Sequence, residues 1–180
     1  MDDRKLSEIY SLYSKGIYWY IYRMVKSRET AEDILHDSFV KLINFSLRND
    51  IDHDHIKGFL YTIAHNTALT ALKRGSLIRF SPIDDNARDS GGDDFTKKIE
   101  MDELNARINE LLDEVDAKGR SLFIMKKELN LTYDEISEIS GMPERTVRRR
   151  IKNILTDLGK KLTDLGFIDK LMIILTFLLN

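Results

Sequence analysis

Apolar residues recur every three or four positions through most of the chain, which is the period of an α-helix. Each stretch that keeps this period is predicted to form a helix. These stretches are residues 6–26, 31–45, 58–74, 95–115, 117–129, 132–140 and 143–162. The pattern therefore predicts an all-α protein.

Two stretches interrupt the helical pattern. Residues 46–57 are polar and keep neither helical nor strand spacing, so they are predicted to form a loop between two helices. Residues 75–94 are rich in Asp, Ser and Gly and cannot bury enough apolar surface to order themselves. The predicted organisation is two small helical domains: an N-terminal domain at 1–74, a flexible acidic linker at 75–96, a helix-turn-helix domain at 97–163 and an apolar tail at 164–180.

The order of residues within 131–162 is that of a helix-turn-helix. Thr132 suits the N-cap of a helix, and Glu135, three residues later, completes a capping box. Gly141 is expected to end this helix. Pro143 suits the first turn of the next one, because its missing N–H group is not needed there.

The second helix of this pair carries five cations and no acid between Arg145 and Lys152. A run of cations is often only a solvated surface. On the second helix of a helix-turn-helix, however, arginine side chains meet guanine edges and phosphates. The candidate DNA-binding residues of this helix are Arg145, Thr146, Arg148, Arg149, Arg150 and Lys152.

The charge of the chain is unevenly distributed along its 180 residues, although the net charge is only −2. Residues 75–118 carry six cations and twelve acids, whereas residues 120–162 carry ten cations and six acids. A basic module thus follows an acidic segment. The chain has no cysteine, which excludes disulfides and zinc–thiolate sites, and its first residues lack the apolar core of a signal peptide. The cytoplasm is the expected location.

The apolar tail ends in LMIILTFLLN, and its run of about ten apolar residues is well short of the roughly twenty that cross a bilayer. No membrane span is expected. Because an exposed apolar tail is a liability, the tail is predicted to be a helix docked on its own domain, on a partner or on a second copy of the chain.

Two groups of residues could suggest catalysis or metal binding. Asp33 and Asp37 lie one helical turn apart, but no histidine follows at a ligating offset, so a docking surface for a basic partner is favoured. His53 and His55 stand beside aspartates, but such a triplet in a loop is usually solvated. No base, nucleophile and oxyanion donor converge, so no enzyme, metal or cofactor is expected.

Three segments in this order resemble a bacterial RNA polymerase sigma factor of the extracytoplasmic function class of the sigma-70 family. Residues 31–39, AEDILHDSF, are similar to the polymerase-binding helix of that family, and residues 58–74, GFLYTIAHNTALTALKR, to its promoter-melting helix. Residues 131–151, LTYDEISEISGMPERTVRRRI, are similar to its recognition unit. The resemblance spans residues 6–162. It implies that the N-terminal domain binds core polymerase and melts the downstream promoter element, while the second domain reads the upstream element.

The resemblance also assigns residues to each role. The implied polymerase-binding residues are Asp33, Asp37, Phe39 and Lys41. The implied contacts to the downstream element are Tyr61, His65, Asn66, Lys73 and Arg74, with Asn49, Asp50 and His53 in a loop that captures a flipped base. Three positions depart from the family: His65 replaces a usual arginine, Thr70 a frequent aspartate and Phe59 a common tryptophan.

The implied partners are core RNA polymerase and promoter DNA, and an anti-sigma factor is a further partner that the resemblance allows. Two DNA-binding modules on a flexible tether gain effective concentration when both sites lie on one duplex. The free chain, with its net charge of −2, should therefore bind DNA poorly until a partner fixes the spacing. The alternative is a stand-alone dimeric helix-turn-helix regulator that reads a palindromic operator.

Overall fold

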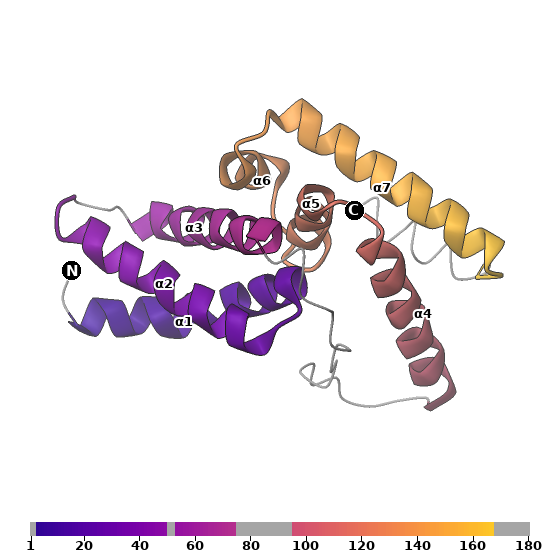
Figure 1. Ribbon diagram of the computed structural model, residues 1–180, viewed down its shortest axis with the longest axis horizontal. Coiled ribbons are helices and arrows are strands. Elements are labelled where there is room, and N and C mark those ends of the chain that lie inside the picture. The colour runs from indigo at the N-terminus through magenta and orange to yellow at the C-terminus, as the bar shows by residue number, and fades with distance from the viewer. Residues whose placement is uncertain (1–2, 50–52, 75–94, 168–180) are drawn as a thin grey trace.

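The computed structural model describes residues 3–49, 53–74 and 95–167, and these residues form helices and short connections with no strand. The helices are α1 (Asp3–Val25), α2 (Arg28–Ser46), α3 (His53–Arg74), α4 (Phe95–Asp113), α5 (Ala117–Lys127), α6 (Tyr133–Ser140) and α7 (Glu144–Asp164). Figure 1 shows α1, α2 and α3 packed together on one flank, with α4 and α7 on the other flank. The predicted all-α fold is confirmed.

Helices α1, α2 and α3 form a three-helix unit in which each helix contacts the other two. Ile17, Ile21 and Met24 make the buried stripe of α1, at the spacing that its sequence predicts. Gly16 lies where α1 passes close to α3, because a Cβ atom there would lie only 2.9 Å from the hydroxyl of Tyr61. The absence of a side chain at Gly16 thus allows the close approach.

The connection between α2 and α3 is shorter than predicted. Helix α2 runs to Ser46 and α3 begins at His53, so the prediction of a loop that reaches residue 57 was wrong. Ile56 is buried and lies one turn before the buried Leu60, so the apolar face of α3 extends back beyond Gly58. Because the other residues of this turn are polar, the sequence pattern did not show that the apolar face begins here.

The helix-turn-helix forms as the sequence predicts. Thr132 accepts a hydrogen bond from the backbone N–H of Glu135 at 3.2 Å, and Glu135 accepts one from the N–H of Thr132 at 2.8 Å. Gly141 ends α6 in the left-handed conformation, with φ of 66°. Pro143 is the N-cap of α7. Helix α7 then packs against α4, α5 and α6.

The two helical units do not stand apart in the structure, because one hydrophobic core runs through both. We call this the shared core. From α1 and α3 it includes Tyr20, Ile21, Leu60, Tyr61 and Ala64, and from the second unit it includes Leu122, Ile124, Met125, Leu131, Ile136 and Ile139. Helix α3 contacts α5 and α6, and α1 contacts α5. The sequence predicts the two domains and a linker between them, but it does not predict this contact between the domains.

A second, smaller core lies between α4, α5 and α7. Leu104, Leu111, Phe123, Leu158 and Leu162 are buried in it, and Phe167 packs against it. Most of the predicted linker and tail fall in residues 75–94 and 168–180, which lie outside the described residues. Among the residues described, no helix is long and apolar enough to cross a membrane.

Candidate nucleic-acid interface

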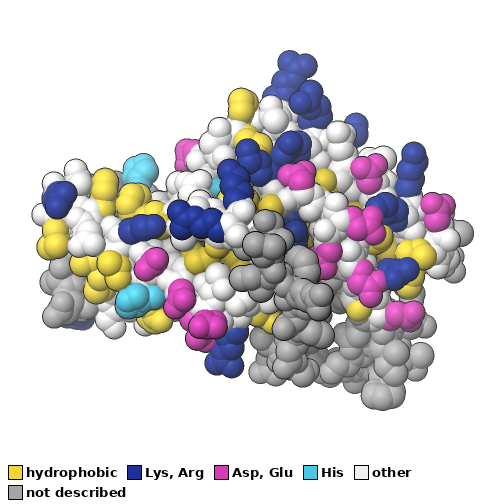
Figure 2. Space-filling view, viewed as in Figure 1, with side chains coloured by type: hydrophobic (Ala, Val, Ile, Leu, Met, Phe, Trp, Pro, Cys, Tyr) yellow, Lys and Arg dark blue, Asp and Glu magenta, His cyan; other side chains and the backbone are white. Residues whose placement is uncertain are grey.

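The N-terminal half of α7 presents cations to solvent. Arg145, Arg148, Arg149 and Lys152 are exposed, and we call this set the open face of α7. Figure 2 shows Lys and Arg side chains gathered over this half of the helix, at the top of the molecule. Thr146 is half-buried beside them. Within the described residues, neither Arg145 nor Arg149 forms an ion pair, so both guanidinium groups are available to a phosphate or a base edge.

Arg148 is held in place by its neighbours. Its guanidinium group lies 4.0 Å from the ring centre of Tyr133, and its Nε donates a hydrogen bond to Glu144 at 2.6 Å. On α5, the ammonium group of Lys126 lies 4.9 Å from the same ring. The ring of Tyr133 therefore links α5, α6 and α7 by cation–π contacts and restricts the orientation of Arg148.

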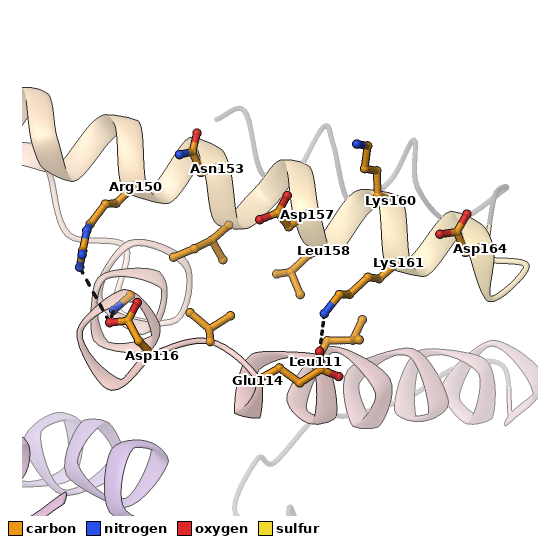
Figure 3. Close-up of a pocket in the computed structure, with 13 residues that line it drawn as sticks. Leu111, Glu114, Asp116, Arg150, Asn153, Asp157, Leu158, Lys160, Lys161 and Asp164 are labelled. Atoms are coloured by element: carbon orange, nitrogen blue, oxygen red, sulfur yellow. Dashed lines mark hydrogen bonds and ion pairs between the residues drawn. The ribbon is translucent and has the colours of Figure 1, made fainter. Parts of the chain in front are cut away.

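Arg150 points away from the open face. One of its Nη atoms lies 3.9 Å from a carboxylate oxygen of Asp116, the N-cap of α5, as Figure 3 shows. The two residues lie at a pocket of about 550 Å³ between α7 and the start of α5. The other charged residues that line this pocket are Glu114, Asp157, Lys160, Lys161 and Asp164. Because charges of both signs alternate there, the pocket offers no surface of one sign to a nucleic acid.

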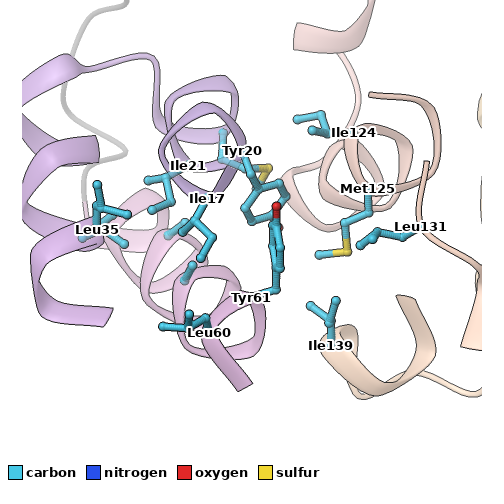
Figure 4. Packing of buried hydrophobic residues seen from close by; sticks show 14 of the residues in the cluster. Ile17, Tyr20, Ile21, Leu35, Leu60, Tyr61, Ile124, Met125, Leu131 and Ile139 are labelled. Carbon is cyan, nitrogen blue, oxygen red and sulfur yellow. The ribbon is translucent and has the colours of Figure 1, made fainter. Parts of the chain in front are cut away.

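Two of the candidate DNA contacts on α3 are buried under the second unit. Tyr61 is 6% exposed and His65 is 2% exposed. Figure 4 shows the rings of Tyr20 and Tyr61 between the apolar side chains of the first unit and those of Met125 and Ile139. In this arrangement neither Tyr61 nor His65 can touch DNA.

His65 lies in a small polar cluster inside the shared core. Its Nδ1 lies 2.8 Å from the hydroxyl of Tyr20, and Ser121 on α5 also interacts with that hydroxyl. Burial and, to a smaller extent, the charge of Lys118 lower the pKa of His65 to about 4. Burial likewise raises the pKa of Tyr20 far above its usual value. His65 is thus neutral near pH 7, and a hydrogen bond joins its Nδ1 to the Tyr20 hydroxyl.

The remaining candidates for the downstream element lie on α3 and in the connection before it. Asn66, Lys73 and Arg74 are exposed on α3. Asn49 is exposed, and its side chain donates a hydrogen bond to the carbonyl of Phe45 at 3.1 Å. His53 is the first residue of α3, and Asp50 lies outside the described residues. The structure therefore leaves Asn49, Asn66, Lys73 and Arg74 accessible, whereas Tyr61 and His65 are buried.

The candidate polymerase-binding residues lie on α2. Asp33 and Asp37 are exposed one turn apart, and Figure 2 shows acidic side chains at the lower flank where α2 lies. Phe39 is buried, with its ring centre 4.9 Å from that of Tyr10. Lys41 is exposed and donates to the hydroxyl of Thr67 on α3 at 3.4 Å. Phe39 therefore supports this surface from below, while the two aspartates and Lys41 form its outside.

Sequence reasoning missed the ion pairs that join the two units. Arg23 on α1 donates two hydrogen bonds to the carboxylate of Glu128, from Nη2 at 2.7 Å and from Nε at 3.0 Å. Lys57 on α3 lies 2.8 Å from Glu135 on α6. These partners are 105 and 78 positions apart in the chain, so no local pattern could have paired them.

Comparison with known families finds two matches along the chain. The family described as Sigma-70 region 2 matches residues 9–77, and the family described as Sigma-70, region 4, matches residues 105–158. The first range holds most of α1, together with α2 and α3, and the second holds the C-terminal part of α4 and most of α7, together with α5 and α6. The two matched ranges thus correspond to the two helical units.

Several characterised proteins are similar over most of the chain. RNA polymerase sigma factor YlaC of Bacillus subtilis is 27% identical over 164 residues, covering 88% of this chain and 92% of the relative. The ECF RNA polymerase sigma factor SigW of the same organism is 26% identical over 175 residues, covering 91% and 92%. The solved sigma factor RpoE of Bartonella quintana, in complex with the anti-sigma factor NepR, has a TM-score of 0.68 at 16% identity. That match covers 89% of this chain and 98% of the solved chain, and it shows a similar fold.

Proposed function

The chain belongs to the sigma-70 family of RNA polymerase sigma factors, in the extracytoplasmic function class, and we propose which of its surfaces carry out promoter-specific transcription initiation. A sigma factor acts by binding polymerase and DNA, so the proposal contains no catalytic step. The open face of α7 is the observation that carries it. Four exposed cations on the second helix of a helix-turn-helix form a surface suited to DNA phosphate and guanine edges.

In this proposal the upstream promoter element binds at the open face of α7. Arg145 and Arg149 are the residues that reach base edges, because no described carboxylate competes for them. Arg148 and Lys152 add phosphate contacts. Arg150 has the smallest role, since it is directed toward Asp116.

Core RNA polymerase binds, in this proposal, at the outer side of α2. Asp33 and Asp37 would meet a basic surface of the polymerase, and the buried Phe39 would hold the helix in position. The exposed aspartates, one turn apart on a helix with its other side in the core, support this assignment. The alternative of a stand-alone dimeric regulator gives no reason for a sigma-70 region 2 match at 9–77.

The downstream element would bind at α3 and at the connection before it. Asn49, Asp50 and His53 provide donors and acceptors near the start of α3, where we propose that a flipped base is captured. Grafting the corresponding loop of another family member should move the preferred base at one promoter position. An unchanged base profile at every position would contradict base capture by this segment.

Further proposed properties follow from the family assignment. An anti-sigma factor is a further proposed partner, since the similar RpoE chain was solved in complex with one. The cytoplasm, where core polymerase acts, is the proposed location. A sigma factor needs no cofactor or metal ion for any of these contacts.

The test is transcription in vitro with core polymerase and a promoter library. Asp37→Arg should abolish transcription and core binding, and Arg149→Ala should weaken transcription from promoters that retain the upstream element. Asp157→Arg and Lys160→Ala are the matched controls, because both change an exposed charge in the C-terminal half of α7. Wild-type activity of Asp37→Arg would remove α2 from the proposed polymerase surface.

A further inference from the structure

The pair formed by α4 and α7 has two flanks of different composition. Helix α4 packs chiefly on α7, and Figure 1 shows both helices at the edge of the molecule, away from α1 and α2. Along one flank lies the pocket of Figure 3, whose lining includes Glu114, Asp157 and Lys161. Because these side chains are charged and exposed, covering this flank with an apolar segment would be unfavourable.

The other flank of α7 is apolar. It consists of Leu155, Gly159 and Leu162, which recur at i, i+4 and i+7 and so share one side of the helix. Asp157 and Lys161 of the pocket are each two positions from Gly159, and at about 3.6 residues per turn they lie on nearly the opposite side. Leu162 is buried in the second core, whereas Leu155 and Gly159 are half-buried. We call these three residues the apolar flank.

Gly159 makes a notch in the apolar flank. A Cβ atom at this position would meet no atom within 4 Å among the described residues, apart from the nearby backbone of its own helix. Glycine weakens the interior of a helix, but it allows another segment of backbone to approach closely. The notch thus leaves space for a further segment of chain against α7.

The end of α7 turns the chain back on itself. Gly166 is in the left-handed conformation, with φ of 85°, and its N–H donates to the carbonyl of Thr163 at 2.9 Å. The N–H of Phe167 donates to the carbonyl of Leu162, also at 2.9 Å. This pair of hydrogen bonds ends a helix and reverses the chain. Because Phe167 also packs against the second core, the chain leaves α7 in a direction back along the α4–α7 pair.

The segment that follows Phe167 is residues 168–180, which lie outside the described residues, and we call it the C-terminal segment. Its sequence, IDKLMIILTFLLN, is apolar at the spacing of a helix. One side of such a helix would carry Ile168, Leu171, Met172, Leu175, Leu178 and Leu179. A helix of this length spans about 20 Å, which is also the distance along α7 from Leu165 back to Lys152.

We propose that the C-terminal segment forms a helix antiparallel to α7 and that its apolar side packs on the apolar flank. In the register set by the turn at the end of α7, Leu171 lies over Gly159 and Leu175 lies beside Leu155. The occupant is the chain's own segment, because the turn directs it along the pair and because the other flank is charged. The docked segment holds the C-terminal half of α7 in place beside the open face. The inference goes beyond the proposed function and does not depend on it.

The first experiment joins the segment to α7. The chain has no cysteine, so Leu155→Cys with Leu175→Cys places two thiols at the proposed contact and nowhere else. Mild oxidation should join them within one chain roughly tenfold faster than it joins Thr156→Cys with Leu175→Cys. The control differs by one position, and Thr156 is exposed. Equal rates for the two pairs, or a product with the mass of two chains, would overturn the proposal.

Thiol reactivity gives an independent measure of docking. Leu175 belongs to the packed side of the proposed helix, whereas Thr176 belongs to its polar side. Leu175→Cys should therefore react with a soluble thiol reagent roughly tenfold more slowly than Thr176→Cys in the folded protein, and at the same rate in urea. Equal rates in the folded protein would contradict docking.

Filling the notch tests where the segment docks. Gly159→Leu, added to Leu175→Cys, should raise the reactivity of the thiol by roughly threefold or more, because the new side chain takes the space proposed for Leu171. Gly58→Leu is the matched control, since a Cβ atom at Gly58 on α3 also meets no described atom within 4 Å. No change with Gly159→Leu, or the same change with Gly58→Leu, would remove the segment from the apolar flank.

Two other occupants of the apolar side predict different results. A second copy of the chain would make the slow reaction of Leu175→Cys depend on protein concentration, whereas docking within one chain gives the same rate over a roughly hundredfold range. A lipid surface would make the wild-type protein sediment with vesicles of phosphatidylcholine and phosphatidylglycerol, and Leu175→Asp would prevent this. Either result would overturn the proposal. None of these measurements uses polymerase or promoter DNA, so their outcome is separate from that of the proposed function.

Discussion

Helices α3 and α7 carry the two predicted DNA surfaces, and these surfaces differ in their exposure to solvent. One side of α3 is buried, with Tyr61 and His65 under the second unit, whereas the open face of α7 is solvated. The difference follows from side-chain chemistry. A face of Tyr, His and Ala residues loses little when it leaves water, whereas a face with four cations would lose far more if no acids paired with them.

The comparison shows that DNA-binding surfaces differ in how easily they can be hidden. A strongly basic helix stays accessible unless an acidic partner covers it. A helix with aromatic and small residues can be covered by any apolar surface of matching shape. The second helical unit of the same chain provides such a surface for α3.

The largest effect is expected from breaking the ion pair between Arg23 and Glu128, the most buried of the pairs that join the two helical units. Arg23→Ala should lower the free energy of unfolding by about 3 to 5 kcal/mol, because it leaves the carboxylate of Glu128 largely buried without its partner. Urea unfolding measures this change. Arg107→Ala is the control, since its pair with Glu110 is exposed and should contribute under about 1 kcal/mol. Equal, small losses for the two variants would show that the contact between the two helical units is not formed in solution.

The next largest effect tests which side of α7 binds DNA. Arg149→Ala should weaken binding to an upstream-element duplex by about 1 to 3 kcal/mol and reduce its salt dependence. Arg150→Ala should cost less, because that side chain is directed toward Asp116. Fluorescence anisotropy over a series of salt concentrations measures both. A larger loss for Arg150→Ala would mean that the helix turns a different face to DNA.

A smaller effect is expected in the pH dependence of stability, which tests whether His65 on α3 is buried. The pKa of His65 is about 4 when folded, below its usual value of 6.5, so the unfolded chain takes up the proton first as the pH falls. Stability is thus full above pH 6.5 and falls toward pH 4, by on the order of 2 kcal/mol between pH 7 and pH 5.

Urea unfolding at several pH values checks this expectation. His65→Gln keeps a polar partner for the Tyr20 hydroxyl but does not titrate, so its stability should fall less over the same interval. The same slope in wild type and variant would show that His65 is solvated, and hence that the α3 surface is accessible.

The smallest effect concerns how Arg148 is held. Tyr133→Leu should relax base selectivity by about 0.5 to 1 kcal/mol, because it removes the ring that orients the guanidinium group at 4.0 Å. Tyr133→Phe keeps the ring and should retain selectivity. Competition binding with single-base variants of the upstream element measures both. If the two variants behave alike, cation–π contact does not orient Arg148.

Much of the local structure could be predicted from the sequence. The helical spacing of apolar residues indicated each helix, and Thr132, Glu135 and Gly141 marked the ends of α6 where the structure has them. The basic run on α7 identified a face that the structure leaves open. These features depend on residues within a few positions of one another, so the local pattern contains the information.

The sequence does not indicate the features that contacts between distant residues decide. The sequence placed Tyr61 and His65 on a DNA surface, but it gave no sign that α5 and α6 cover them. It also grouped Arg150 with the other arginines of α7, although the Arg150 side chain is directed toward Asp116 and not toward the open face. Both features concern which face of a predicted helix is covered, and the sequence does not show this.

The sequence by itself determined the helices, their caps and the charge of each face, because these are set by local backbone preferences and by the period of the helix. Only the tertiary structure decided that one core joins the two halves and that α3, not α7, is covered. That choice depends on the shape match of side chains far apart in the chain, such as Tyr61 with Met125, and on pairs such as Arg23 with Glu128. Packing between distant residues leaves no repeating pattern in the sequence, so the sequence alone does not predict it.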